Sequence, residues 1–206
     1  YTQQMASVFA QQQEGKLPLD RQQATDLLKA QLNLEPQLYG AFAGFEPNGF
    51  DDQDAAFAGQ TALGSDSQGR FVPYFYRDKE QIGTDLLLSI EKSDADEFGN
   101  PANDYYACPK REGRSCLIDP FKVDINSQQV LVSTITTPIM VAGKFKGIAA
   151  LDLAVAFQPG LMLAFYIGAF SGFAFGFMGA RFVFHRPLTD SVAIAFACSH
   201  QITGIY

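Results

Sequence analysis

The fold is decided by residues 128–155, which read QQVLVSTITTPIMVAGKFKGIAALDLAV. From Val130 to Thr137 the even positions carry valine and threonine, and the odd positions carry leucine, serine, isoleucine and threonine. This period of two predicts a β-strand. Gly143 and Lys144 predict a turn, and the run KGIAALDLAV that follows predicts a second strand. We therefore expect an antiparallel hairpin near the end of the folded region.

Helices are expected before the sheet, and further strands between them and the hairpin. Residues 1–13 have apolar side chains at helical spacing. A second helix is expected from Asp20 to Leu34, because Asp20 and Gln23 have capping-box spacing and a proline follows. The other predicted strands are LYGAFAGF (38–45), GRFVPYFYR (69–77), DYYACPK (104–110) and CLIDPFKVD (116–124). Helices packed on an antiparallel meander place the chain in the α+β class.

The composition argues for three parts: 1–35 with the helices, 36–158 with the sheet, and an atypical tail, 159–206. No charged residue lies between Gly160 and Ala180, and about twenty helical residues cross a bilayer core of about 30 Å. Glycines recur at every fourth position from 168 to 176, as in packed membrane helices, and arginines follow. A membrane span, a pair of buried strands and a tail outside its ancestral reading frame all remain open.

The acidic segment GFEPNGFDDQD, residues 44–54, invites a calcium-binding interpretation, which its spacing excludes. An EF-type loop that begins at Asp52 would place Ala56 and Phe57 where an oxygen ligand and a glycine are required. We expect instead a turn whose two phenylalanines pack inward. No metal site is predicted here.

The charge and the motifs narrow the functional class. The chain has a formal net charge of −7 and a pI of about 4.7, which disfavours binding to nucleic acid. No glycine-rich nucleotide motif and no nucleophile elbow occurs in the sequence. We therefore expect a protein that is not an enzyme and needs no cofactor. Because the chain begins at Tyr1 within a helical pattern, we expect a fragment that lacks its targeting segment.

Two cysteines, Cys108 and Cys116, bracket the basic stretch PKREGRS, which we interpret as a hairpin loop. In an oxidising compartment a disulfide between them could close this loop. The alternative is two free thiols on neighbouring strands, because spacing alone does not establish disulfide geometry.

Asp152 is the strongest candidate for a binding residue, because it is an acid within the small and apolar strand GIAALDLAV. Aromatic residues and Arg70 lie on strands expected nearby. A buried carboxylate among tyrosines can bind an ammonium group, and an arginine can grip a carboxylate. The alternative is that Asp152 caps a turn and the tyrosines form ordinary core. The candidate site residues besides Asp152 are Arg70, Tyr74, Phe75, Tyr105 and Tyr106.

The blocks FEPNGFDDQD, GRFVPYFYR, NDYYACPK, VLVSTITTPI and GKFKGIAALDL occur in an order that resembles the double-Cache sensor of bacterial methyl-accepting chemotaxis proteins. The resemblance covers residues 1–158 and the membrane-distal lobe of that sensor. It implies a long N-terminal helix and a PAS-like antiparallel sheet flanked by helices. A second Cache lobe would be expected next, so the tail could also be part of that lobe.

The resemblance implies a periplasmic sensor at the bacterial inner membrane that binds an amino acid or another amine and signals through its N-terminal helix. It also implies a homodimer in the intact receptor, attached to the membrane through flanking segments. The family's amine-binding aspartate matches Asp152, its aromatic residue matches Tyr105 or Tyr106, and its carboxylate grip falls between Arg70 and Phe75. The alternative function is a membrane-tethered interaction protein with a vestigial pocket.

Overall fold

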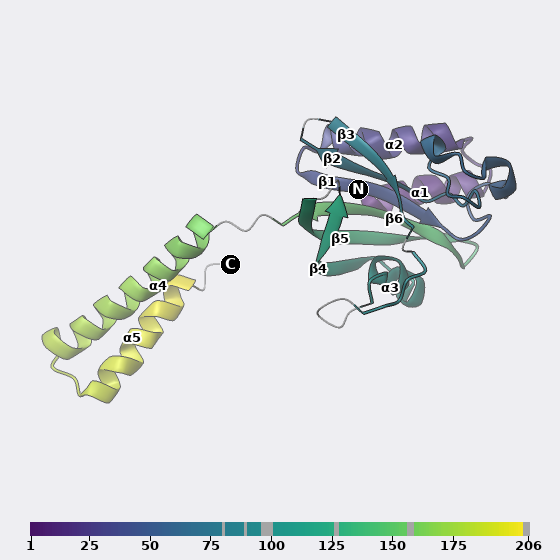
Figure 1. The fold of residues 1–206 in the computed structure, drawn as a ribbon. Helices are drawn as coiled ribbons and strands as arrows, with labels where there is room; N and C mark the ends of the chain where they lie inside the picture. The colour runs from purple at the N-terminus through teal and green to yellow at the C-terminus, as the bar shows by residue number, and fades with distance from the viewer. Residues whose placement is uncertain (80, 89, 96–100, 126–127, 156–158, 204–206) are drawn as a thin grey trace. The chain divides into compact units, whose positions relative to one another are not determined.

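The computed structural model describes residues 1–79, 81–88, 90–95, 101–125, 128–155 and 159–203. It divides into two compact units, Tyr1–Val155 and Ala156–Tyr206. The first contains a six-stranded antiparallel sheet with strand order β3-β2-β1-β6-β5-β4 (Figure 1). The strands are β1 (Leu38–Phe45), β2 (Pro73–Asp78), β3 (Gln81–Leu86), β4 (Cys116–Ile125), β5 (Gln128–Val141) and β6 (Lys144–Ala154). The predicted α+β class is confirmed.

The hairpin of β5 and β6 lies beside the edge strand β4 and agrees closely with the sequence pattern. Val141 pairs with Lys144, so the turn is Ala142–Gly143, one residue before the predicted position. Both turn residues have positive φ, 48° and 75°, as a two-residue hairpin turn of type I′ requires. β6 also pairs with β1, which makes it a central strand.

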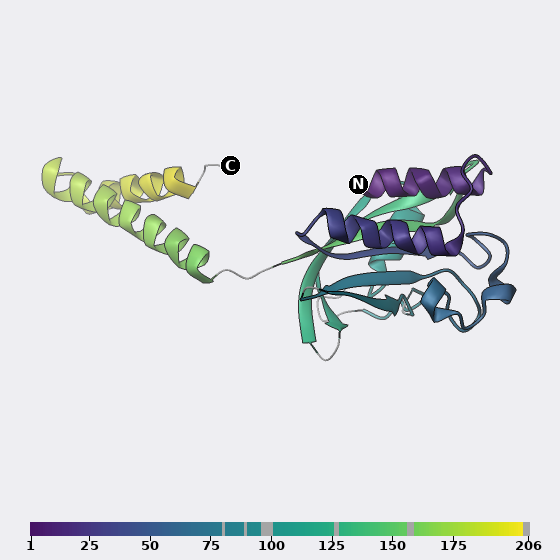
Figure 2. The same cartoon turned by 90° about the horizontal axis from the view of Figure 1, so that it is seen from above.

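Two helices, α1 (Thr2–Gln13) and α2 (Arg21–Leu34), cover one face of the sheet (Figure 2). The capping box at the start of α2 is present: Asp20 accepts from the backbone N–H of Gln23, and Gln23 accepts from that of Asp20. Apolar residues of both helices pack on the sheet residues that point to this face. This core contains Phe9, Leu28, Leu32, Ala41, Phe45, Phe75 and Leu151.

A third helix, α3 (Asp104–Glu112), covers the opposite face by packing on β4, β5 and β6. The prediction of a strand for DYYACPK was therefore wrong. Helix-favouring signals outweigh the β-propensity of the two tyrosines: an acid in the first turn, Lys110 and Arg111 in the last turn, and Gly113 with φ 66° at the C-cap. The strand β3, beside β2, was not predicted.

The segment 44–54 joins the end of β1 to the helix layer. Phe50 packs in the core against Phe9, Phe45 and Phe71. Two acids of this segment bind the guanidinium group of Arg21, which is only 1% exposed. Asp51 accepts two hydrogen bonds from it, at 2.9 and 2.7 Å, and Asp54 accepts one at 2.9 Å. The expected inward turn is present, and these two acids fasten the start of α2.

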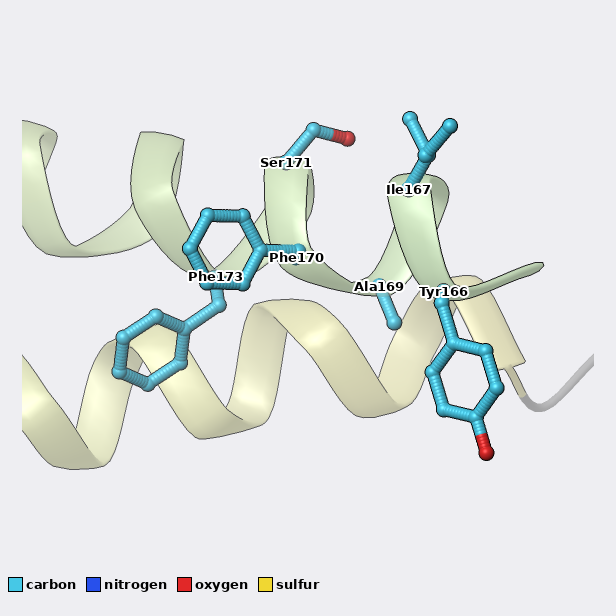
Figure 3. Close-up of a pocket in the computed structure, with 6 residues that line it drawn as sticks. All are labelled: Tyr166, Ile167, Ala169, Phe170, Ser171 and Phe173. Atoms are coloured by element: carbon cyan, nitrogen blue, oxygen red, sulfur yellow. The ribbon is translucent and has the colours of Figure 1, made fainter. Parts of the chain in front are cut away.

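The second unit contains α4 (Pro159–Met178), a π-helical turn η3 (Gly179–Val183) and α5 (Leu188–Thr203). The interpretation of this tail as buried strands was wrong. Residues Leu163–Val183 are long and apolar enough to cross a membrane, and only 6% of the most apolar part of this stretch is buried. Figure 3 shows a surface hollow on α4, lined by Tyr166, Ile167, Ala169, Phe170, Ser171 and Phe173. The Ser171 hydroxyl donates to the Gly168 carbonyl of its own helix, so this hollow offers little polar chemistry.

Candidate functional site

The candidate site lies on the α3 side of the sheet, where three central strands bring small and polar residues to Asp152. In the sheet register, Asp152 of β6 pairs with Thr134 of β5 on one side and Gly40 of β1 on the other. Because side chains alternate between the two faces of a strand, all three positions belong to the same face. Asp152 is 2% exposed.

Two hydroxyl groups hold the Asp152 carboxylate. Thr134 Oγ1 donates to Oδ1 at 2.5 Å, and Tyr74 Oη of β2 donates to Oδ2 at 2.9 Å. Both contacts are buried, and no cation is paired with Asp152 among the described residues. The site is therefore a buried carboxylate compensated only by neutral donors.

This environment sets the protonation of both partners. Burial raises the pKa of Asp152 to about 6, although the hydrogen bonds from Thr134 and Tyr74 act in the opposite direction. Burial also raises the pKa of Tyr74 far above its usual value, and the Asp152 carboxylate raises it further. Tyr74 therefore remains a proton donor across the physiological range, while Asp152 titrates just below neutral pH.

Aromatic rings on this face form a connected group that includes Tyr74, which contacts the carboxylate. Phe42 makes edge contacts with Tyr74 and Tyr105, at centroid distances of 5.5 and 5.7 Å, and Tyr74 stacks on Tyr76 at 6.0 Å. The pKa of Tyr39 is raised by burial, by Tyr76 and by Asp152, which places this fifth ring in the same electrostatic environment. The negative faces of such rings attract cations.

Arg70 does not reach this site. Its Nε donates to the carbonyl of Phe45 at 2.5 Å, Nη1 donates to Glu91 at 2.5 Å and Nη2 donates to the hydroxyl of Tyr106 at 3.2 Å. Phe45 lies at the far end of β1 from Gly40, which is about 17 Å at the rise of a strand. No α-amino acid spans that distance, so the structure does not place Arg70 and Asp152 as the two ends of one amino-acid clamp.

Tyr106 belongs with Arg70 rather than with Asp152. Its hydroxyl donates to Glu46, which also accepts from Lys110 Nζ at 2.6 Å. Burial alone would raise the pKa of Glu46, but the bonds from Lys110 and Tyr106 outweigh it and lower the pKa below its usual value. Of the two expected site residues that lie on α3, Tyr105 contacts the ring of Phe42 and Tyr106 belongs to this second cluster.

Phe75 lies on the other face of the sheet. Its neighbours in β2, Tyr74 and Tyr76, point toward α3, whereas Phe75 belongs to the core under α1 and α2. The ammonium group of Lys29 lies 4.9 Å from its ring centroid. The structure therefore separates Phe75 from Asp152, as the alternation of a strand requires.

A disulfide joins Cys108 of α3 to Cys116 of β4, with a Cα–Cα distance of 6.3 Å. Of the two alternatives for these cysteines, the structure has the bonded one, although it links a helix to a strand rather than closing a strand hairpin. The bond ties α3, which carries Tyr105, to the edge strand of the sheet.

The sequence patterns did not identify several residues of the site. The strand register places Thr134 and Gly40 beside Asp152. Tyr39 is assigned to the site because Asp152 contributes to the rise of its pKa. Among the described residues, two buried side-chain atoms lack a hydrogen-bond partner, Thr136 Oγ1 and Asn103 Oδ1. The alternation of β5 was the signal that could have placed Thr136 on the face of Thr134.

Comparison with known proteins agrees with this architecture. A family model for the methyl-accepting chemotaxis protein-like, first PDC sensor domain matches residues 24–157. The chain belongs to this family. Its resemblance to chemoreceptor sensors, expected from the ordered sequence blocks, is thereby confirmed.

Individual relatives support the same family. The chain is 31% identical over 153 residues to the methyl-accepting chemotaxis protein TlpQ of Pseudomonas aeruginosa PAO1, covering 71% of the chain and 21% of that protein. The chain thus spans about a fifth of the length of this curated relative.

Solved structures show the same fold. The extracellular domain of mmHK1S-Z3, assigned as a histidine kinase, is 27% identical with a TM-score of 0.60, covering 74% of this chain and 49% of that one. Methyl-accepting chemotaxis protein X is 21% identical with a TM-score of 0.60, covering 74% of this chain and 52% of the other.

Proposed function

We propose that this chain is the extracytoplasmic ligand-binding sensor domain of a chemoreceptor, and that it binds a small organic ammonium ion at Asp152. The observation that carries the ligand class is a buried carboxylate, compensated only by the hydroxyls of Thr134 and Tyr74, within a group of aromatic rings. A buried anion without a cationic partner costs folding free energy, which a bound ammonium ion offsets.

The carboxylate has capacity for this ligand. An ionised carboxylate offers about four lone-pair sites, and the two hydroxyl donors occupy one on each oxygen. An ammonium group can donate to the remaining sites through charge-assisted hydrogen bonds while its substituents contact the rings. Phe42 and Tyr105 are the walls that such a ligand would contact.

An amine suits this site better than an α-amino acid. Arg70 is held by Glu91 and the Phe45 carbonyl, about 17 Å along β1 from the level of Asp152. The two side chains that hydrogen-bond to Asp152, those of Thr134 and Tyr74, are both neutral. The carboxylate of an amino acid would therefore be buried without a positive partner.

The receptor context completes the proposal. Membership of the sensor family supports a periplasmic location and a role in binding rather than catalysis. The apolar stretch Leu163–Val183 supports attachment to the inner membrane. Ligand binding would change the populations of two positions of the N-terminal helix in a homodimeric receptor. α1 suits this role because Thr2 accepts a 2.9 Å hydrogen bond from Thr137 of β5, the strand that neighbours β6.

Isothermal titration of the purified chain with a panel of primary amines and amino acids tests this proposal. We expect amines to bind. In a thermal-denaturation experiment they should also raise the melting temperature of the protein by mass action. Asp152→Asn should abolish binding, whereas Asp119→Asn, which neutralises an exposed acid on β4, should not. If no amine binds, the sensor proposal fails in favour of a membrane-tethered interaction protein with a vestigial pocket. Equal binding by Asp152→Asn would remove Asp152 from the site.

A further inference from the structure

Thr136 is a buried polar residue on β5, the strand that also carries Thr134. It is 0% exposed, and its hydroxyl has no hydrogen-bond partner among the described residues. In the register of the sheet it pairs with Cys116 of β4 and Ala150 of β6, so its nearest strand neighbours are apolar. Valine has the same shape and would avoid the cost of a buried, unsatisfied hydroxyl.

The other buried threonines of β5 show the contrast. Thr134 donates to Asp152, and Thr137, on the opposite face, bonds to Thr2 and Ser115 at 2.9 Å each. Thr136 lies two residues from Thr134 on the same face, a separation of about 7 Å. Its hydroxyl therefore lies on the face, and within the reach, of a small molecule held at Asp152.

A second unsatisfied atom belongs to the residue just before the covering helix α3. Asn103 directly precedes α3, and its Nδ2 donates to the Ile90 carbonyl at 3.0 Å. Its Oδ1 is buried without a partner among the described residues. Two buried polar atoms thus have no partner among the described residues, a hydroxyl that donates or accepts and a carbonyl that accepts.

We infer that Thr136 forms a second ligand subsite, so that the preferred ligand is an amine with a second hydrogen-bonding group about 4–7 Å from its nitrogen. This inference rests on the proposed function, because Asp152 must hold the ammonium end. Thr136 can donate to an acceptor or accept from a donor, so a hydroxyl, an amide or a ring nitrogen fits. Simple alkylamines would leave the Thr136 hydroxyl unsatisfied and bind less tightly.

Two isosteric probes separate this subsite from the ammonium site. 4-Aminobutan-1-ol and pentan-1-amine differ by a terminal hydroxyl in place of a methyl group. We expect titration calorimetry to show that Thr136→Val lowers the affinity for the amino alcohol about three- to tenfold, which corresponds to the loss of one neutral hydrogen bond. The affinity for the alkylamine should not fall. Thr136→Ser, which retains the hydroxyl, should keep the wild-type preference between the probes.

Thr137→Val is the matched control, because it removes a hydroxyl from the same strand on the opposite face. It should leave the ratio of the two affinities unchanged. If Thr136→Val lowers the affinities for both probes equally, or lowers neither, the subsite is overturned while Asp152 stays the ammonium site. If the wild type binds other amines but neither probe, the subsite is also overturned. Failure of every amine to bind would overturn the proposed function and the subsite with it.

Discussion

Gly40 and Asp152 lie opposite each other on β1 and β6, and the missing side chain of Gly40 provides the space that the Asp152 carboxylate occupies. A Cβ at position 40 would stand 2.6 Å from Asp152 Oδ2 and 3.0 Å from the Tyr74 hydroxyl. The backbone of β1 therefore passes directly beneath the hydrogen bond between Tyr74 and Asp152. The φ angle of Gly40 is not positive, so its backbone conformation does not require a glycine. The close approach to Asp152 and Tyr74 does.

Gly40→Ala should lower amine affinity at least tenfold, because the new methyl group would push the carboxylate and the Tyr74 hydroxyl apart. Overpacking of this kind should also cost about 1–3 kcal/mol of unfolding free energy. Titration calorimetry and urea denaturation measure the two effects. Gly179→Ala, where an added Cβ meets nothing within 4 Å, should leave the affinity unchanged. Unaltered binding in Gly40→Ala would contradict the role of this close approach.

Asp152→Asn should stabilise the protein near neutral pH. The folded pKa of about 6 lies above the usual 3.8, so the folded protein binds more protons than the unfolded chain between these values. Stability contributed by this group is therefore lost as the pH rises from about 4 to about 6. Two pKa units correspond to about 3 kcal/mol, so we expect Asp152→Asn to gain about 1–3 kcal/mol at pH 7.5.

Urea denaturation at pH 4 and pH 7.5 checks this expectation. The gain should vanish at pH 4, where the carboxyl group is already protonated in the folded protein. Asp119→Asn, on the exposed side of β4, should change stability by less than about 0.5 kcal/mol at both values. A gain that is equal at the two pH values would show that the titration of Asp152 is not its source.

Amine binding should weaken as the pH falls through about 6. Protonation of Asp152 removes the charge that attracts the ammonium group, while an alkylamine remains protonated throughout. Well below the pKa, each further pH unit should cost about tenfold in affinity. Titration calorimetry between pH 5 and pH 8 measures this dependence, and affinity that is constant over this range would exclude an ionised Asp152 as the partner.

Arg21→Met should destabilise the fold by about 3–5 kcal/mol, because it leaves Asp51 and Asp54 without their buried cation. The effect should appear in urea denaturation as a lower midpoint. Lys16→Met is the control: its ion pair with Glu14 is exposed, so the change should stay below about 1 kcal/mol. Similar stabilities for the two variants would show that the Arg21 cluster does not fasten α2.

Local signals in the sequence predicted much of the fold. The alternation between Val130 and Thr137 identified β5, and the capping box at Asp20 identified the start of α2, because these patterns depend on neighbours along the chain. Local signals misled at α3, where tyrosines with high β-propensity lie in a helix. They also missed β3, whose pairing with β2 supports a strand without a strong pattern of its own.

The sequence by itself determined the class of the fold and singled out Asp152, because an acid within an apolar strand is costly wherever that strand is buried. Only the tertiary structure decided what surrounds it. Strand register brings Thr134, Tyr74 and Gly40 to the carboxylate from distant parts of the chain, and the alternation of β2 sends Phe75 to the other face. The length of β1 keeps Arg70 away. Pairing between strands depends on contacts across the whole sheet, so no local pattern contains it.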